Sequence, residues 1–89
     1  MIRRTIHYSG RVQGVGFRAT VHTLAAGRAV TGFVRNMPDG RVEAVYEGEP
    51  TDVDGLTATV LDRMGANVER TDVREGRATG EFRSFEVRR

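Results

Sequence analysis

The stretch VTGFVRNMPDGRVEAVY, residues 30–46, reads as two β-strands joined by a tight turn. Before the turn, small or apolar residues occupy positions 30, 32 and 34, and after it positions 42, 44 and 46, which is the spacing of one strand face. Between them, Pro38 presets one backbone dihedral and Gly40 tolerates positive φ. The stretch therefore predicts a β-hairpin.

A helix is predicted on each side of this hairpin. Apolar residues recur at helical spacing in two stripes, made of Phe17, Val21, Leu24 and Ala25, and of Val53, Leu56, Val60, Leu61 and Met64. Gly27 and Gly65 are the expected stop signals of the two helices. Residues 51–54, with the sequence TDVD, resemble an N-cap followed by acids in the first turn, where they favour the helix dipole.

Further strands are predicted outside the helices. Residues 2–9 alternate with period two, Val68 and Val73 mark a weaker strand, and Phe82, Phe85 and Val87 suggest a last one. In a regular strand Phe82 and Phe85 would face opposite ways. The order βαββαβ, with a possible extra C-terminal strand, predicts an α+β ferredoxin-like sandwich, an antiparallel sheet with two helices on one face. This architecture hosts many functions.

Length and composition limit the class of protein. With 89 residues, 38% of them hydrophobic and 29% charged, the chain is expected to form a single globular domain over residues 1–89. It has no cysteine, which excludes disulfides, thiolate catalysis and cysteine-bound metal. No stretch is apolar enough to serve as a signal peptide or a membrane span, so a cytoplasmic location and no membrane partner are predicted.

The positive charge of the chain comes from arginine, because the sequence has no lysine. All 14 basic residues are arginines, and 12 acidic residues are interleaved with them to leave a net charge of +2. Arginine suits phosphate recognition, including that of nucleic acids. Because no basic stripe is present, however, the pattern favours a mixed surface, and no nucleic-acid partner is predicted.

The segment GRVQGVG, residues 10–16, follows a predicted strand and opens a predicted helix. Its glycines let successive N–H groups turn inward, and a helix N-terminus adds unpaired donors and partial positive charge. Arg18 supplies a permanent charge with a planar fork of donors. These features favour phosphate binding, although the residues alone leave open a merely tight strand-to-helix connection. A literal G-x-G-x-x-A match at residues 14–19 is weak, because the hairpin contradicts a dinucleotide-binding unit.

Two motifs connect the chain to a known family. The run GRVQGVGFR, residues 10–18, resembles the acylphosphatase signature, and GFVRNMPDGRVE, residues 32–43, resembles that family's second signature at the expected distance. The resemblance covers essentially the whole chain. One departure is Phe33, where many members carry tryptophan.

The resemblance implies a site and an activity. It assigns phosphate binding to Val12, Gln13, Gly14, Val15, Gly16, Phe17 and Arg18. It makes Arg18 and Asn36 the catalytic residues, with Asn36 orienting the water that attacks phosphorus. The implied enzyme needs no metal or other cofactor and hydrolyses small acyl phosphates, such as acetyl phosphate, carbamoyl phosphate or 1,3-bisphosphoglycerate, to carboxylate and inorganic phosphate.

Several alternatives remain at this point. An asparagine beside a turn, such as Asn36, is commonly an Asx-turn residue. The two histidines are expected to be surface or structural, Tyr8, Phe33 and Phe85 to be core rather than base-stacking residues, and Glu43, Glu47 and Glu49 to form a solvated or edge face. The alternative function is a non-catalytic anion- or RNA-binding ferredoxin-like module. Nothing in the sequence demands more than a monomer.

Overall fold

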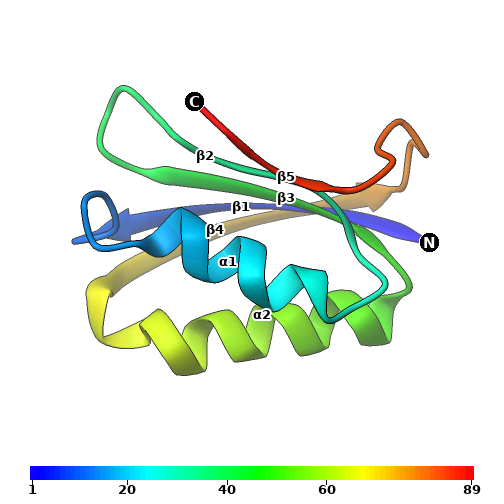
Figure 1. Ribbon diagram of the computed structural model, residues 1–89, viewed down its shortest axis with the longest axis horizontal. Coiled ribbons are helices and arrows are strands. Elements are labelled where there is room, and N and C mark those ends of the chain that lie inside the picture. The colour runs from blue at the N-terminus through cyan, green and yellow to red at the C-terminus, as the bar shows by residue number, and fades with distance from the viewer.

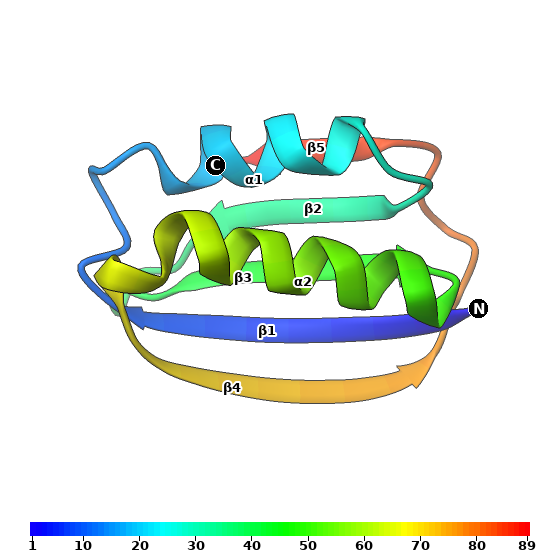
Figure 2. The same ribbon diagram turned by 90° about the horizontal axis from the view of Figure 1, so that it is seen from below.

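The computed structural model describes residues 1–89. Its elements are β1 (Ile2–Gly10), α1 (Phe17–Ala26), β2 (Thr31–Asn36), β3 (Val42–Gly48), α2 (Pro50–Met64), the 3-10 helix η1 (Gly65–Asn67), β4 (Val68–Arg77) and β5 (Phe85–Arg88). The strands form one sheet in the order β4-β1-β3-β2-β5, and both helices cover the same face of it (Figures 1 and 2). The predicted ferredoxin-like architecture with an extra strand is confirmed. Neither helix is long and apolar enough to cross a bilayer.

The central hairpin forms with the predicted turn. β2 and β3 pair antiparallel, and Asn36 lies opposite Val42 next to the turn. The Gly40 N–H donates to the Met37 oxygen at 3.1 Å, and Gly40 has a φ of 92°, which favours glycine. The hairpin thereby fixes where β2 ends and where Asn36 is presented.

The extra strand makes the sheet mixed. The four strands of the βαββαβ core pair antiparallel, but β5 pairs parallel to β2, with Val87 opposite Val34. The segment from residue 78 to 84 causes this arrangement, because it carries the chain from one edge of the sheet to the other before β5 begins (Figure 2). Phe85 then enters the core, whereas Phe82 precedes the strand and packs 5.8 Å from the Phe33 ring on the opposite face.

The core lies between the sheet and the two helices. The hydroxyls of Tyr8 and Tyr46, both fully buried, lie 3.1 Å apart and satisfy each other, so neither leaves an unpaired polar atom in the core. The predicted stripe of α1 is confirmed, but Leu61 of α2 is 38% exposed. Leu61 follows the buried Val60 by one residue, about 100° around the helix, and therefore points away from the sheet.

The start of α2 also differs from the prediction. Glu49 is the N-cap and Pro50 is the first helical residue, so Thr51 lies inside the first turn instead of capping it. Proline suits the first position because its fixed φ is helical and its missing N–H is not needed there. Asp52 does lie in the first turn, and the helix ends before Gly65 as expected.

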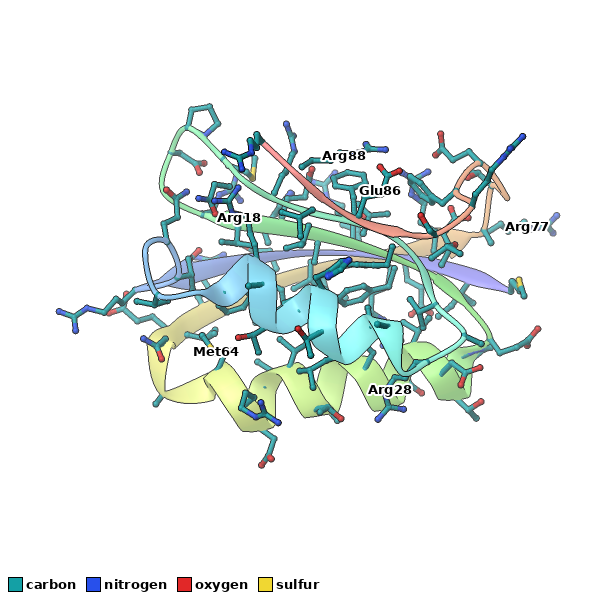
Figure 3. All side chains as sticks on the ribbon, in the orientation of Figure 1. Arg18, Arg28, Met64, Arg77, Glu86 and Arg88 are labelled. Atoms are coloured by element: carbon teal, nitrogen blue, oxygen red, sulfur yellow. The ribbon has the colours of Figure 1, made fainter.

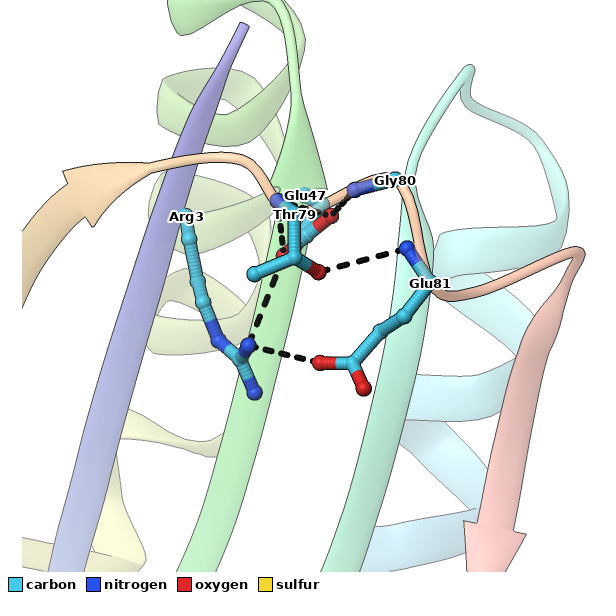
Figure 4. Close-up of polar contacts among 5 residues, drawn as sticks. All are labelled: Arg3, Glu47, Thr79, Gly80 and Glu81. Carbon is cyan, nitrogen blue, oxygen red and sulfur yellow. Dashed lines mark hydrogen bonds and ion pairs between the residues drawn. The ribbon is translucent and has the colours of Figure 1, made fainter.

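Glu47 of β3 differs from its prediction. Instead of lying on a solvated face it is 3% exposed, and its carboxylate accepts hydrogen bonds from the Thr79 and Gly80 N–H groups at 3.0–3.1 Å and the Thr79 hydroxyl at 2.9 Å (Figure 4). Arg3 lies 3.7 Å away. Burial alone would raise the pKa of Glu47, but these donors outweigh it and the pKa is lowered. Glu47 thus fastens the segment that leads into β5.

Candidate active site

The loop between β1 and α1 has a backbone that only glycine adopts easily. Gly14 and Gly16 have φ values of 74° and 76°, and no residue other than glycine in the chain has positive φ. A Cβ at either position would meet no atom within 4 Å, so the backbone conformation, and not the available space, requires glycine. Gly16 also caps α1, and its oxygen accepts from the Thr20 N–H at 3.0 Å.

The N–H groups of this segment are free. None of the backbone N–H groups of residues 12–19 donates to another backbone oxygen or to a side chain of the protein. The first turn of any helix has such donors, but here the preceding loop extends the run. A run of free donors at a positive helix end suits an anion with several oxygens.

Arg18, the second residue of α1, brings a formal charge to the same place. Its Nη1 donates to the backbone oxygen of Arg88 at 3.3 Å, and no carboxylate lies within 4.0 Å of it. Figure 3 shows Arg18 reaching from the first turn of α1 toward the edge formed by β2 and β5. The contact uses one of the five guanidinium N–H donors, so the remaining ones are available to a ligand.

Asn36, the last residue of β2, contributes an amide side chain with no hydrogen-bond partner in the protein. The Asx-turn alternative therefore does not hold for Asn36. Asp39 takes that part instead, because its Oδ1 accepts from the Arg41 N–H at 3.1 Å. The Asn36 carbonyl oxygen and NH2 group are both free to hold a small molecule.

Gln13 joins the loop to the hairpin turn. Its Nε2 donates to the backbone oxygens of Met37 and Arg41, at 2.9 Å each. The loop and the end of β2 are therefore held in one arrangement. Because both hydrogens of Nε2 are used in this clamp, the backbone N–H is the only Gln13 donor left for an anion.

These groups surround a cavity of about 240 Å³. It is lined by Val12, Gly14, Gly16, Phe17, Arg18, Ala19, Asn36, Val87 and Arg89. Of the residues expected to bind phosphate, Gln13 and Val15 do not line it. The side chains of Val12 and Phe17 are buried in the core, so these two residues offer mainly backbone.

Three lining residues were missed by the sequence analysis: Ala19, Val87 and Arg89. Ala19 follows Arg18 in the first turn of α1, whereas Val87 belongs to β5 and Arg89 follows that strand directly. The position of Val87 and Arg89 at the cavity depends on the parallel pairing of β5 with β2, which no local sequence pattern predicts. The side chains that line the cavity include two arginines and no acidic residue or histidine, so these side chains favour an anion.

A family profile described as acylphosphatase matches residues 4–87. The chain belongs to the acylphosphatase family. It is 46% identical over 88 residues to an acylphosphatase of Roseiflexus sp. (strain RS-1), with 98% of this chain and 95% of that protein covered. It is 48% identical over 92 residues to an acylphosphatase of Methylococcus capsulatus, with 100% and 98% covered. The crystal structure of an acylphosphatase from Bacillus subtilis matches all of both chains with a TM-score of 0.90 at 32% identity.

The other candidate residues of this acylphosphatase-family chain lie outside the cavity. His7 lies 2.7 Å from Glu43 on the helix-free face of the sheet, and His22 is exposed on α1. Tyr8, Phe33 and Phe85 are at most 9% exposed, so they form no stacking platform for RNA bases. The prediction that these aromatic residues serve packing is confirmed.

Proposed function

We propose that this cavity hydrolyses the carboxyl–phosphate bond of small acyl phosphates, releasing a carboxylate and inorganic phosphate. The observation that carries the proposal is that one cavity is lined by residues with free backbone N–H groups (12, 14 and 16–19), by Arg18 and by Asn36, whose amide has no partner in the protein. Membership of the acylphosphatase family supports this hydrolase over a non-catalytic anion- or RNA-binding module.

The phosphoryl group would bind against the loop and the start of α1. The N–H groups of residues 14–18 would donate to its oxygens, and Arg18 would contribute two parallel donors from its fork. Phosphoryl transfer passes through a transition state with charge on the three equatorial oxygens. Fixed amide groups and a guanidinium stabilise that charge without having to reorganise. This stabilisation of the transition state would be the source of the rate acceleration.

Asn36 would hold the attacking water. Its carbonyl oxygen accepts a hydrogen bond from water, and its NH2 group donates to a phosphoryl oxygen. As the water oxygen bonds to phosphorus, the bond to the acyl oxygen breaks and its electron pair leaves with the carboxylate. A carboxylate needs no proton to leave. Since no acidic residue or histidine lines the cavity, the proton of the water would pass to a phosphoryl oxygen of the substrate.

The test is hydrolysis of benzoyl phosphate in excess chelator, because we propose that turnover needs no metal. Arg18→Ala and Asn36→Ala should each lower kcat/KM by about 100-fold or more, as removal of a transition-state donor does. Arg11→Ala and Asn67→Ala are the matched controls, since both residues lie outside the cavity. Circular dichroism would show that each variant is folded. Wild-type protein that is folded and inert would contradict the proposal.

A monomer located in the cytoplasm, made of a single domain over residues 1–89, stays a prediction. Size-exclusion chromatography with light scattering and cell fractionation would check the first two, and limited proteolysis the third. No nucleic-acid or membrane partner is proposed, and the substrate is a small molecule.

A further inference from the structure

Two arginines stand at the end of the last strand: Arg88 is the final residue of β5 and Arg89 follows it. The Arg88 guanidinium lies 4.2 Å from the centre of the Phe33 ring, on the face without helices. Because side chains alternate along an extended chain, the residues on either side of Arg88 project toward α1. Val87 and Arg89 accordingly line the cavity, and Arg88 does not.

Arg89 has no partner that would hold it elsewhere. It forms no hydrogen bond or ion pair within the protein, whereas Arg88 is stacked on Phe33 and lies 3.5 Å from Glu86. In both ribbon views the chain end lies level with the first half of α1 along the long axis of the molecule (Figures 1 and 2). Arg89 is therefore a second free cation at a cavity that contains no acidic side chain.

The cavity is larger than a phosphoryl group. At the ~30 Å³ that one water occupies in the liquid, a phosphoryl group takes the space of a few waters, roughly 60–90 Å³. That leaves much of the 240 Å³ for the acyl part of a substrate. The proposed phosphoryl donors come from the loop, α1 and Asn36 at the end of β2, whereas β5 and the residue after it supply a separate wall. Val87, an apolar residue that is 43% exposed, offers that wall to a carbon chain or ring.

We propose that Val87 and Arg89 form a subsite for the acyl group, in which Arg89 selects acyl phosphates that carry a second anionic group. This inference rests on the proposed hydrolase function and names the substrate class for it. The acyl carbons would contact Val87, and a terminal carboxylate or phosphate would accept hydrogen bonds from the Arg89 guanidinium. Arginine suits both anions because its planar fork matches two oxygens at once.

The experiment compares two substrates of the same shape, benzoyl phosphate and 4-carboxybenzoyl phosphate. Arg89→Ala should lower kcat/KM for the carboxylated substrate by about tenfold, the effect of one charge-assisted hydrogen bond, and that for benzoyl phosphate by less than about twofold. Arg89→Lys should keep most of the preference because it keeps the charge. Arg89→Glu should reverse it. Arg74→Ala, which removes an exposed arginine from β4 at the opposite edge of the sheet, is the control and should change neither substrate.

The possible results distinguish a failure of the acyl subsite from a failure of the proposed hydrolase function. If wild-type protein cleaves neither substrate, the hydrolase proposal itself fails. If it cleaves both and Arg89→Ala slows them equally, Arg89 serves the phosphoryl group and the acyl subsite is wrong. If Arg89→Ala changes neither substrate, the inference is likewise overturned. A preference that weakens as salt is added, disappears in Arg89→Ala and reverses in Arg89→Glu would support it.

Discussion

The Arg18 guanidinium donates to the backbone oxygen of Arg88, at 3.3 Å, so the second residue of α1 is held by the last strand of the sheet. The contact joins residues 70 positions apart in sequence. The contact limits the rotamers of Arg18 and leaves most of its N–H donors free. The guanidinium is thereby preorganised before the substrate binds.

Arg18→Lys should be nearly as inactive as Arg18→Ala. A lysine keeps the charge, but its ammonium is a point charge and has no planar fork to reach a carbonyl oxygen and two phosphoryl oxygens together. We expect kcat/KM for benzoyl phosphate to fall by about 100-fold. The melting temperature should stay within about 2 °C of wild type, because partly exposed hydrogen bonds contribute little to stability. A lysine variant with near wild-type activity would show that charge alone suffices.

Gly14→Ala and Gly16→Ala should be destabilising, whereas Gly65→Ala should not. An alanine in the left-handed region costs about 1–2 kcal/mol, and both loop glycines lie there. Gly65 has a φ of −58° and open space around its Cα, so alanine there should stabilise by about 0.4–1 kcal/mol through the unfolded state. Urea denaturation measures the difference. Equal effects at all three positions would contradict the assigned backbone conformation of the loop.

Gln13→Ala should loosen the loop from the hairpin turn. It removes both hydrogen bonds to the Met37 and Arg41 oxygens, and we expect a loss of about 1–2 kcal/mol in the free energy of unfolding. Because the turn follows Asn36 directly, the affinity for inorganic phosphate, the proposed product, should also fall. Gln13→Glu is the sharper variant, since a carboxylate facing two carbonyl oxygens can donate to neither. Unchanged stability in both variants would count against the clamp.

Glu47 should make stability depend on pH in the acidic range. Its pKa is lowered in the folded protein, so its contribution is present above the ordinary glutamate pKa of about 4.3 and is lost as pH falls through the lower folded value. Glu47→Gln should cost about 1–3 kcal/mol at pH 7, because an NH2 group would face the Thr79 and Gly80 N–H donors. Its cost should shrink toward pH 3. A cost that does not change between pH 7 and pH 3 would contradict the assignment. Glu49→Gln, on an exposed residue, is the control.

The fold was predictable where the pattern is local. The period-two alternation within residues 30–46 and the turn with Pro38 and Gly40 predict the hairpin. The helical spacing of apolar residues predicts α1 and most of α2. The prediction for Leu61 was wrong because the sequence does not show how wide the buried stripe of α2 is. Thr51 was predicted to be the N-cap of α2 because threonine suits that position. The helix instead begins at Pro50, since proline suits the first helical position.

The candidate site was predictable only as far as its residues lie in the two motifs. Arg18, Asn36 and the loop glycines line one cavity, as the resemblance implied, but their roles stay predictions. Val87 and Arg89 could not be found, because their approach depends on a parallel strand pairing across more than 50 residues. The burial of Glu47 was missed for the same reason, since the segment that covers it comes from residues 79–80.

The strand β5, which closes the cavity, is paired with a neighbour on one side only and comprises four residues. An edge strand of this length is a unit that opens by local fluctuation long before the whole molecule unfolds. Each opening would release Arg18 and remove Val87 and Arg89 from the substrate together. If so, heat inactivation of the enzyme should precede the loss of its helices.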